Sequence, residues 1–388
     1  MAASQRVYMD WNATAPLLDE ARTALVAGLD LMNPSSVHGE GRAARAALEK
    51  ARRQVAGLVG ASPANVVFTS GATEAANLVL TPEFRMGRRA VSIGHLYVSA
   101  IEHPAIREGG RFSVGSVTEV PVTSNGVLDL EALRLALDAH DDNKGLPMVA
   151  VMAVNNETGT IQPLQAVAER VRAKGGLLVV DAVQAVGRIA LDMEAIGADF
   201  LIISSHKIGG PKGVGALIAR GETLMPAPLV RGGGQEKGHR SGTENLPAIL
   251  GFGAAAEVAS QNLEDRNARI ASLRDRLEAG MRQVFPDVVI HGAGAPRVAN
   301  TCFFSLPGLK SETGQIAFDL EGIALSAGSA CSSGKVGESH VLAAMGCDPK
   351  LGALRLSLGV STTREEIERV LAAFAKVAGR LNRNGQAA

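Results

Sequence analysis

Five short apolar runs lie between residues 66 and 219, and small or polar residues follow each of them directly. Apolar runs of this length, bounded in this way, predict strands that are buried on both faces. Because helix-like segments separate most of the runs, we predict a mostly parallel sheet covered by helices, which is an α/β fold. The predicted strands are residues 66–69, 149–154, 177–180, 200–203 and 215–219.

Polar side chains follow three of these predicted strands where each strand ends. Asn156, Asp181 and Lys207 each come within four residues of the end of an apolar run. In a parallel sheet the carboxyl ends of the strands share one edge, and ligands bind beyond that edge. We therefore expect the chemistry of the protein to be found around these three residues.

The length of 388 residues predicts two or three domains with sizeable cores. A helical stretch from about residue 247 to 284 predicts a connecting helix between domains. The alternating strand-like and helix-like pieces that follow it indicate a smaller α+β domain. We predict a large domain of residues 17–258 and a small domain made of residues 1–16 and 259–388.

The composition excludes several classes of protein. The chain is 46% hydrophobic and 20% charged, which is typical of a folded protein and not of a disordered one. Its 39 Lys and Arg residues balance 39 Asp and Glu residues, so we expect neither nucleic acid nor an anionic membrane as a partner. No apolar run approaches the roughly 18 residues of a membrane span, and the first residues lack the apolar segment of a signal peptide. We therefore expect a cytoplasmic protein.

The three cysteines lie far apart in the sequence, so neither a disulfide framework nor a metal site is indicated. Cys302 precedes two phenylalanines, which predicts a buried structural thiol. Cys347 follows a glycine, which is typical of a loop. Cys331 lies in the Gly- and Ser-rich segment 328–337, and an exposed thiol there suits a nucleophile that carries its product out of a site.

Three further features together match the needs of pyridoxal phosphate. Small residues surround Lys207, so a flat ring can approach a lysine that forms a Schiff base; the alternative is an ordinary surface lysine. Asp181 is suited to pair with a pyridinium nitrogen, and its less favoured alternative is a helix N-cap. The segment 71–74 opens a helix and offers backbone N–H groups to a phosphate, and its alternative is a simple capping motif.

With these motifs in place, the chain resembles the NifS-like cysteine desulfurases, pyridoxal-phosphate enzymes of the class V aminotransferase group. The resemblance implies the type I fold of pyridoxal-phosphate-dependent transferases, with a mostly parallel seven-stranded sheet in the large domain. It covers nearly the whole chain, through residues 8–16, 33–38, 68–74, 102–103, 154–157, 181–184, 204–207, 240–245, 328–331 and 355–359.

The resemblance implies roles for residues around the cofactor ring. Lys207 would bind the cofactor covalently and move the Cα proton of the substrate. Asp181 would pair with the pyridine nitrogen, and Gln184 would bond the phenolic oxygen. His103 would stack on the ring and assist proton transfer; its alternative is a histidine satisfied by the turn at Pro104.

The resemblance also implies how the phosphate and the substrate are held. The phosphate would lie among Ala72, Thr73, Ser204 and His206. Thr243 would reach the phosphate of a neighbouring subunit, which implies a homodimer with shared sites. For the substrate carboxylate the resemblance implies two residues, Asn156, which is also expected at the cofactor, and Arg355, whose guanidinium suits a bidentate grip.

By the same resemblance, Cys331 would attack the sulfur of L-cysteine, become a persulfide and release L-alanine. The sulfur would pass to an iron–sulfur scaffold or another acceptor protein. The sequence departs from the family where residues 336–339 replace the usual Leu-Glu-Pro step, and the chain ends soon after residue 383. These departures put in doubt any docking of a scaffold that depends on those segments.

Two alternatives remain at this point. A selenocysteine lyase or an aminotransferase on the same scaffold would use Lys207 and Asp181 without requiring Cys331. A non-catalytic partner protein would keep the fold only for binding. The presence of Lys207, His103 and Cys331 together argues against the latter.

Overall fold

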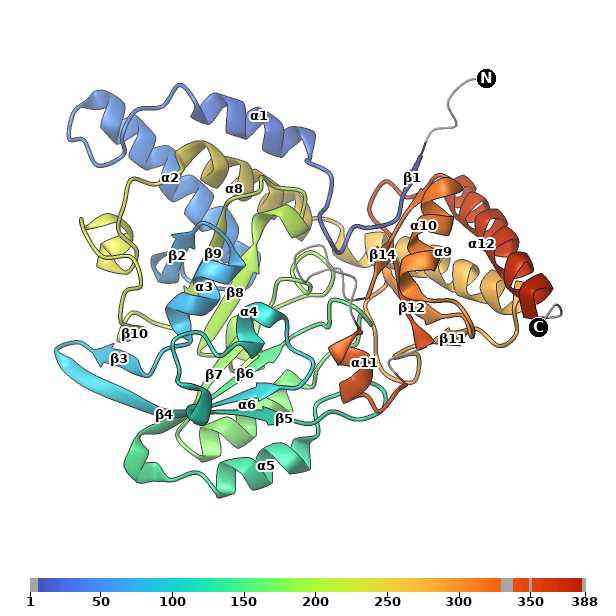
Figure 1. Ribbon diagram of the computed structural model, residues 1–388. Coiled ribbons are helices and arrows are strands. Elements are labelled where there is room, and N and C mark those ends of the chain that lie inside the picture. The colour runs from blue at the N-terminus through green and yellow to red at the C-terminus, as the bar shows by residue number, and fades with distance from the viewer. Residues whose placement is uncertain (1–5, 329–337, 349–350, 386–388) are drawn as a thin grey trace.

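The computed structural model describes residues 6–328, 338–348 and 351–385, so the segment that contains Cys331 lies outside the described residues. A large sheet flanked by helices occupies one side of the molecule, and a smaller group of strands and helices occupies the other (Figure 1). No described helix is long and apolar enough to cross a bilayer.

The large sheet contains all five strands that the apolar runs predict, with small shifts at their ends. Its central strands β4, β5, β6, β7 and β8 are parallel, and β9 joins β8 and β2 antiparallel, which confirms the mostly parallel seven-stranded sheet. Antiparallel β3 and β10 extend it to nine strands in the described chain. The bounds are β2 (Val66–Thr69), β3 (Glu83–Met86), β4 (Arg89–Ser99), β5 (Val117–Val120), β6 (Leu146–Met152), β7 (Leu177–Asp181), β8 (Phe200–Ser204), β9 (Gly215–Ala219) and β10 (Leu224–Pro226).

Alternating side chains of the central strands enter two different cores. In β7, Leu178 and Val180 pack on one face of the sheet, whereas Leu177 and Val179 pack on the other. Because a strand alternates its side chains between faces, an uninterrupted apolar run is what burial on both faces requires. The helices that cover the sheet are α1 (Asp19–Gly28), α2 (Gly39–Gly57), α3 (Ala72–Val79), α4 (Pro104–Arg107), α5 (Leu130–Asp138), α6 (Leu164–Ala173), α7 (Met193–Ile196) and α8 (Leu246–Ser260).

The smaller group of elements has a core of its own, in which Phe304, Phe318 and Phe374 meet. Val7 and Met9 belong to this core, and Figure 1 shows β1 beside the C-terminal elements. Because Val7 and Met9 pack in this second core, we propose that the chain divides as predicted into a large domain of residues 17–258 and a small domain of residues 1–16 and 259–388. The elements are β1 (Val7–Tyr8), β11 (Val289–Ile290), β12 (Thr301–Ser305), β13 (Ile323–Ala324), β14 (Ser326–Ala327), β15 (Leu354–Ser357), α9 (Leu263–Val284), α10 (Ser311–Leu320), α11 (His340–Ala344) and α12 (Arg364–Gly385).

The prediction of one connecting helix over residues 247–284 is wrong. Gln261 is extended and Asn262 is left-handed, with φ of 48°, so α8 ends at Ser260 and α9 begins at Leu263. Asparagine tolerates the left-handed region better than most residues, which allows a sharp break without glycine or proline. The break turns the chain from the large sheet toward the smaller group of elements.

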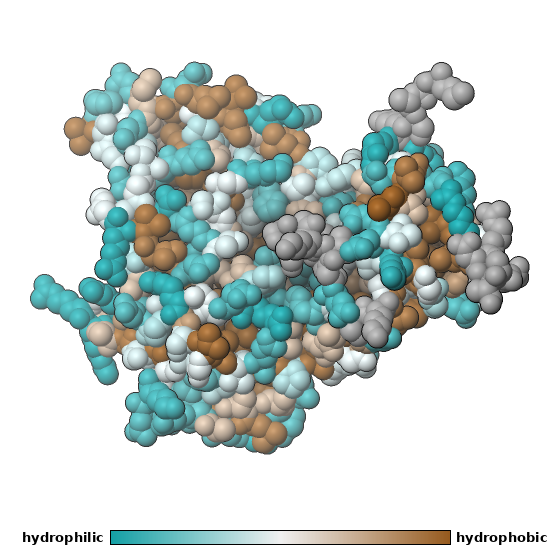
Figure 2. Space-filling view, in the orientation of Figure 1, coloured by the Kyte–Doolittle hydropathy of each residue, from teal (hydrophilic) through white to brown (hydrophobic). Residues whose placement is uncertain are grey.

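The face shown in Figure 2 is a mixture of hydrophilic and hydrophobic residues, with brown side chains gathered near the top over α1. Val26, Leu29 and Met32 are the exposed apolar residues of this region. Short 3-10 helices complete the described structure at Pro63–Asn65, Val114–Ser116, Asp142–Lys144, Ser205–Lys207 and Gln235–Gly238.

Candidate active site

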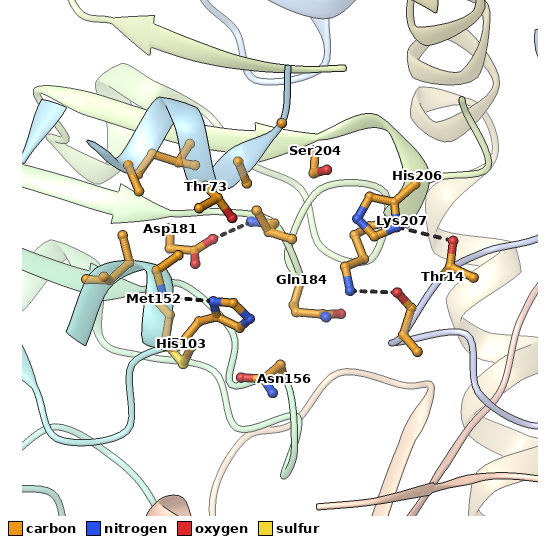
Figure 3. Close-up of a pocket in the computed structure, with 18 of the residues that line it drawn as sticks. Thr14, Thr73, His103, Met152, Asn156, Asp181, Gln184, Ser204, His206 and Lys207 are labelled. Atoms are coloured by element: carbon orange, nitrogen blue, oxygen red, sulfur yellow. Dashed lines mark hydrogen bonds between the residues drawn. The ribbon is translucent and has the colours of Figure 1, made fainter. Parts of the chain in front are cut away.

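A cavity of about 510 Å³ lies at the carboxyl ends of β6, β7 and β8 and at the start of α3. Figure 3 shows residues from these elements pointing into it. We call it the catalytic cavity. The predicted site residues that line it are Ala72, Thr73, His103, Asn156, Asp181, Gln184, Ser204, His206 and Lys207.

One end of the catalytic cavity is built to receive an anion. Ala72 and Thr73 begin α3, and no side chain caps this helix, so N–H groups of its first turn remain available. A helix N-terminus with uncapped N–H groups stabilises a phosphate. Ser204, His206 and Lys212 line the same cavity and add polar and cationic groups to it.

Asp181 and His103 both line the catalytic cavity, as Figure 3 shows. Burial raises the pKa of the Asp181 carboxyl, while its bond from the Val183 N–H at 2.9 Å and the charges of His103 and Lys207 oppose that rise. Burial lowers the pKa of His103, whose Nδ1 accepts the Ala105 N–H at 3.1 Å. His103 therefore caps α4 and lines the cavity at the same time.

Lys207 follows β8 on a single 3-10 turn and reaches back to the N-terminal part of the chain. Its Nζ donates to the carbonyl oxygens of Asn12 at 2.6 Å and Ala13 at 2.9 Å. Gln184 Nε2 donates to the same Asn12 oxygen at 3.0 Å, and Arg188 donates to Gln184 Oε1. Because a carbonyl only accepts and a guanidinium only donates, these two partners fix which way the Gln184 amide faces.

Residues 10–15, which we call the N-terminal strap, supply site residues that the sequence analysis missed. Asn12 is buried and donates from Nδ2 to Thr301 Oγ1 at 3.0 Å, and Thr14 Oγ1 bonds His206 Nδ1 at 3.1 Å. Burial, with help from the charges of two neighbouring lysines, lowers the pKa of His206 to about 4. The only signal for these residues was the match of segment 8–16 to the family pattern.

Arg355 lies behind the catalytic cavity and does not line it. Its side chain is 1% exposed, with Nη1 donating to the Asn156 carbonyl at 2.9 Å and Nη2 to Asp10 Oδ1 at 2.8 Å. Its Nε has no partner within the described residues. The predicted substrate-binding pair is thus adjacent, and Asp10 is a neighbour that the sequence analysis missed.

Glu102, beside His103 in the sequence, is a further residue that the sequence analysis missed. Its Oε1 accepts the Met152 N–H at 2.7 Å, whereas its Oε2 has no partner among the described residues. Complete burial and the charge of Asp181 raise the pKa of this carboxyl well above its usual range. The protonated form of this carboxyl is therefore favoured, next in sequence to His103, which lines the catalytic cavity.

Thr243, Cys302 and Cys347 do not line the catalytic cavity of this single chain. Thr243 is exposed and lines a separate pocket of about 160 Å³ that shares Ser70 and Gly213 with the catalytic cavity. Cys302 is buried in β12, as predicted, and Cys347 is half-buried with its Sγ 4.0 Å from His291 Nδ1. Cys331 lies outside the described residues.

Comparisons with known proteins agree with this arrangement. Residues 7–370 match the family model described as aminotransferase class-V. An IscS-like cysteine desulfurase of Mycobacterium tuberculosis is 37% identical over 98% of both chains, and a cysteine desulfurase of Cereibacter sphaeroides is 40% identical over 95% of this chain and 94% of its own. The solved structure of a NifS-like protein from Rickettsia africae covers 96% of this chain and 99% of its own, with a TM-score of 0.86 and 31% identity.

The chain belongs to the aminotransferase class-V family. Enzymes of this family use pyridoxal phosphate, and the class-V residues described above fit that cofactor. The uncapped start of α3 suits the phosphate, the buried Asp181 carboxyl suits a protonated ring nitrogen, and Lys207 supplies an amine. Another structural relative, described as SspA in complex with cysteine, covers 92% of this chain with a TM-score of 0.75 and 26% identity.

Proposed function

We propose that this class-V enzyme is a cysteine desulfurase that converts L-cysteine to L-alanine and keeps the sulfur as a persulfide on Cys331. The observation that carries the proposal is that Lys207, Asp181 and His103 line one cavity in a chain similar, over nearly its full length, to cysteine desulfurases. The binding of cysteine by a structural relative supports the substrate class.

Bound pyridoxal phosphate would serve as the electron sink that makes the Cα–H and Cβ–S bonds of cysteine breakable. The residues of the chain supply the positioning and the proton movements. The start of α3 with Ser204 and His206 would hold the phosphate, and Asp181 would keep the ring nitrogen protonated. Lys207 would accept the Cα proton at Nζ, which lies at the cavity wall beside the carbonyls of the N-terminal strap.

The substrate carboxylate would be held on the side where Asn156 meets Arg355. The Arg355 guanidinium is fully buried and forms an ion pair with Asp10. It is therefore desolvated before the substrate binds. Because Arg355 lies behind the cavity lining and donates to the Asn156 carbonyl, it would act by positioning Asn156, and a direct charge-assisted hydrogen bond to the carboxylate would require Arg355 to reach the cavity. This arrangement would orient the thiol of cysteine away from Arg355.

Cys331 would act as a thiolate on the sulfur of bound cysteine. A new S–S bond would form, the Cβ–S bond would break, and its electron pair would remain on Cβ, which a proton then converts to the methyl group of alanine. The balance needs no external oxidant, because the carbon is reduced as the sulfur is oxidised. Delivery of the persulfide to an iron–sulfur scaffold or another acceptor is the onward step that we propose.

Thr243 supports the proposal of a homodimer. It is exposed and lies outside the catalytic cavity of its own chain, yet its pocket abuts the phosphate end of that cavity. In a dimer it would bond the phosphate of the partner subunit. Light scattering should give the molecular mass of a dimer. Thr243→Ala should bind the cofactor more weakly.

The test of function is to incubate the cofactor-loaded protein with L-cysteine and measure alanine and protein persulfide. Cys331→Ser should abolish both products and retain the visible absorbance of the bound cofactor. Cys347→Ser is the matched control and should keep both products, because that thiol lies outside the cavity. Normal turnover by Cys331→Ser would refute the nucleophile, and formation of keto acids would indicate the aminotransferase alternative.

A further inference from the structure

Lys207 forms part of the wall of a second cavity, on the side away from Asp181. This cavity has a volume of about 310 Å³ and lies among the N-terminal strap, the junction of α8 and α9, and residues 358–360. We call it the rear cavity. Its apolar walls include Trp11, Leu18, Ile270 and Leu358. A partly open cavity of this size with mostly apolar walls is typical of a small-molecule site.

The charges around the rear cavity all have one sign. Arg188, Lys207 and Arg266 line it, and none of its described lining residues is Asp or Glu. Arg266 donates to four backbone carbonyls, and Lys207 donates to two, so their hydrogen bonds are largely committed. The remaining cation, Arg188, is the group that would meet a ligand.

Arg188 has no acidic partner within the described chain. Its Nη1 donates to the backbone oxygen of Gln184 at 2.9 Å and to the Oε1 of the same residue. Burial, together with repulsion from the Arg355 guanidinium, lowers the pKa of Arg188 to about 9. Arg188 is half-buried, and a guanidinium that has lost part of its water gains free energy when an anion pairs with it.

We propose that the rear cavity binds a small carboxylate with an apolar body, and that Arg188 grips its carboxylate. The apolar walls exclude a highly charged anion such as a nucleotide, whose phosphates would lose their water without enough donors to replace it. At roughly 30 Å³ for each water-sized group, the volume accommodates on the order of ten non-hydrogen atoms. A straight-chain acid of about six carbons fits both limits.

Such a ligand would be coupled to the catalytic cavity through one side chain. Arg188 holds Gln184 Oε1, and Gln184 Nε2 shares the Asn12 carbonyl with Lys207. A carboxylate on Arg188 would compete with Oε1 for the guanidinium and so alter the orientation of an amide that lines the catalytic cavity. The rear cavity would therefore be a regulatory site, a function beyond the proposed desulfurase reaction.

The protein carries its own probe, because Trp11 lines the rear cavity and is the single tryptophan of the chain. The holoenzyme, with its catalytic cavity filled by cofactor, is titrated with sodium hexanoate while tryptophan fluorescence is followed. The neutral analogue hexanamide is titrated in parallel. We expect a saturable change with hexanoate and at least about tenfold weaker binding of hexanamide, because only the acid makes a charge-assisted bond to Arg188.

Arg188→Met should weaken hexanoate binding to the level of hexanamide, whereas Arg188→Lys should retain most of the difference. Ala259→Phe, which fills the rear cavity from its wall, should abolish binding of both, and retained visible absorbance of the cofactor in each variant shows that it has folded. Equal affinity for acid and amide, or hexanoate binding that survives Ala259→Phe, would overturn the proposal. The same titration on Cys331→Ser keeps this result independent of desulfurase activity.

Discussion

The two cavities on either side of Lys207 differ chiefly in the signs of their charges. The catalytic cavity sets Asp181 against His103, Lys207 and Lys212, so it offers both an acid and several bases or cations. The rear cavity offers cations without a described acid. A site with both signs suits a ligand that has a cationic ring and an anionic phosphate, whereas a site of one sign suits a simple anion.

The two cavities also differ in how the chain builds them. The catalytic cavity is made mainly from consecutive strand ends of one sheet, where the topology places ligands. The rear cavity arises where segments far apart in the sequence meet, including Trp11, the α8–α9 break and Leu358. The first kind of site follows from a strand pattern, and the second depends on packing between separate parts of the fold.

The largest expected effect follows from removing the group that the two cavities share. Lys207→Ala should lower alanine formation by about 10⁴-fold or more, because the amine that we propose to bind the cofactor and move the proton is lost. The visible absorbance of the covalently bound cofactor should disappear with it. Lys376→Ala is the control and should keep that absorbance, because Lys376 is exposed and pairs with Glu321 away from both cavities. A Lys207→Ala protein with both absorbance and turnover would contradict the assignment.

Asp181→Asn changes only the catalytic cavity and should lower turnover by about 10²- to 10³-fold, because an amide cannot hold the ring nitrogen protonated by charge. Turnover and the absorbance maximum of the bound cofactor are the measurements. Asp199→Asn is matched in burial but pairs with Arg220 away from both cavities, so it should leave the absorbance unchanged. If Asp181→Asn left turnover and the absorbance maximum unchanged, the negative charge that distinguishes the catalytic cavity from the rear cavity would have no role in the reaction.

Glu102, next to His103 of the catalytic cavity, should make the free energy of unfolding depend on pH. Because its pKa is raised well above the usual 4.5, the folded chain keeps a proton that the unfolded chain loses. The free energy of unfolding should therefore fall as pH rises above about 4.5, by at most about 1.4 kcal/mol per pH unit, until the folded pKa is passed. Denaturant unfolding between pH 5 and 8 should show that Glu102→Gln removes this contribution and that exposed Glu264→Gln does not.

The smallest expected effect comes from changing Gln184, which lines the catalytic cavity and bonds Arg188 of the rear cavity. Gln184→Glu places a carboxylate beside Arg188 from the catalytic side, so it should compete with hexanoate in the rear cavity and weaken its binding by about tenfold. Gln184→Leu removes the bond without adding a charge and should leave hexanoate binding within about threefold. Unchanged hexanoate affinity in Gln184→Glu would show that Arg188 does not join the two sites.

The sequence predicted the large sheet well, because Leu177–Asp181 and its neighbours are continuous apolar runs that only a doubly covered strand explains. It also indicated Lys207 and Asp181 from their positions after such runs. The break at Asn262 was missed, since neither glycine nor proline marks it. A left-handed asparagine inside a helical pattern has no local signal of its own.

The parts of the site that escaped prediction depend on long-range contacts. Asn12 and Ala13 act through backbone carbonyls, which any residue type would present, so only the fold shows that they receive Lys207. Asp10 and Glu102 were passed over because their partners, Arg355 and Met152, lie far along the chain. Arg188 was not singled out, because its place in the rear cavity and its lack of a described acidic partner become visible only in the fold.

The N-terminal strap has a consequence for synthesis of the protein. Asn12 binds Lys207 through its carbonyl oxygen, and its own N–H is held by Ser357 Oγ at 2.9 Å. Chains emerge from the ribosome N-terminus first, so the strap must wait for almost the entire polypeptide before its final contacts can form. Nascent chains stalled before residue 357 would therefore capture cofactor poorly, even though Lys207 and the whole central sheet have already been translated.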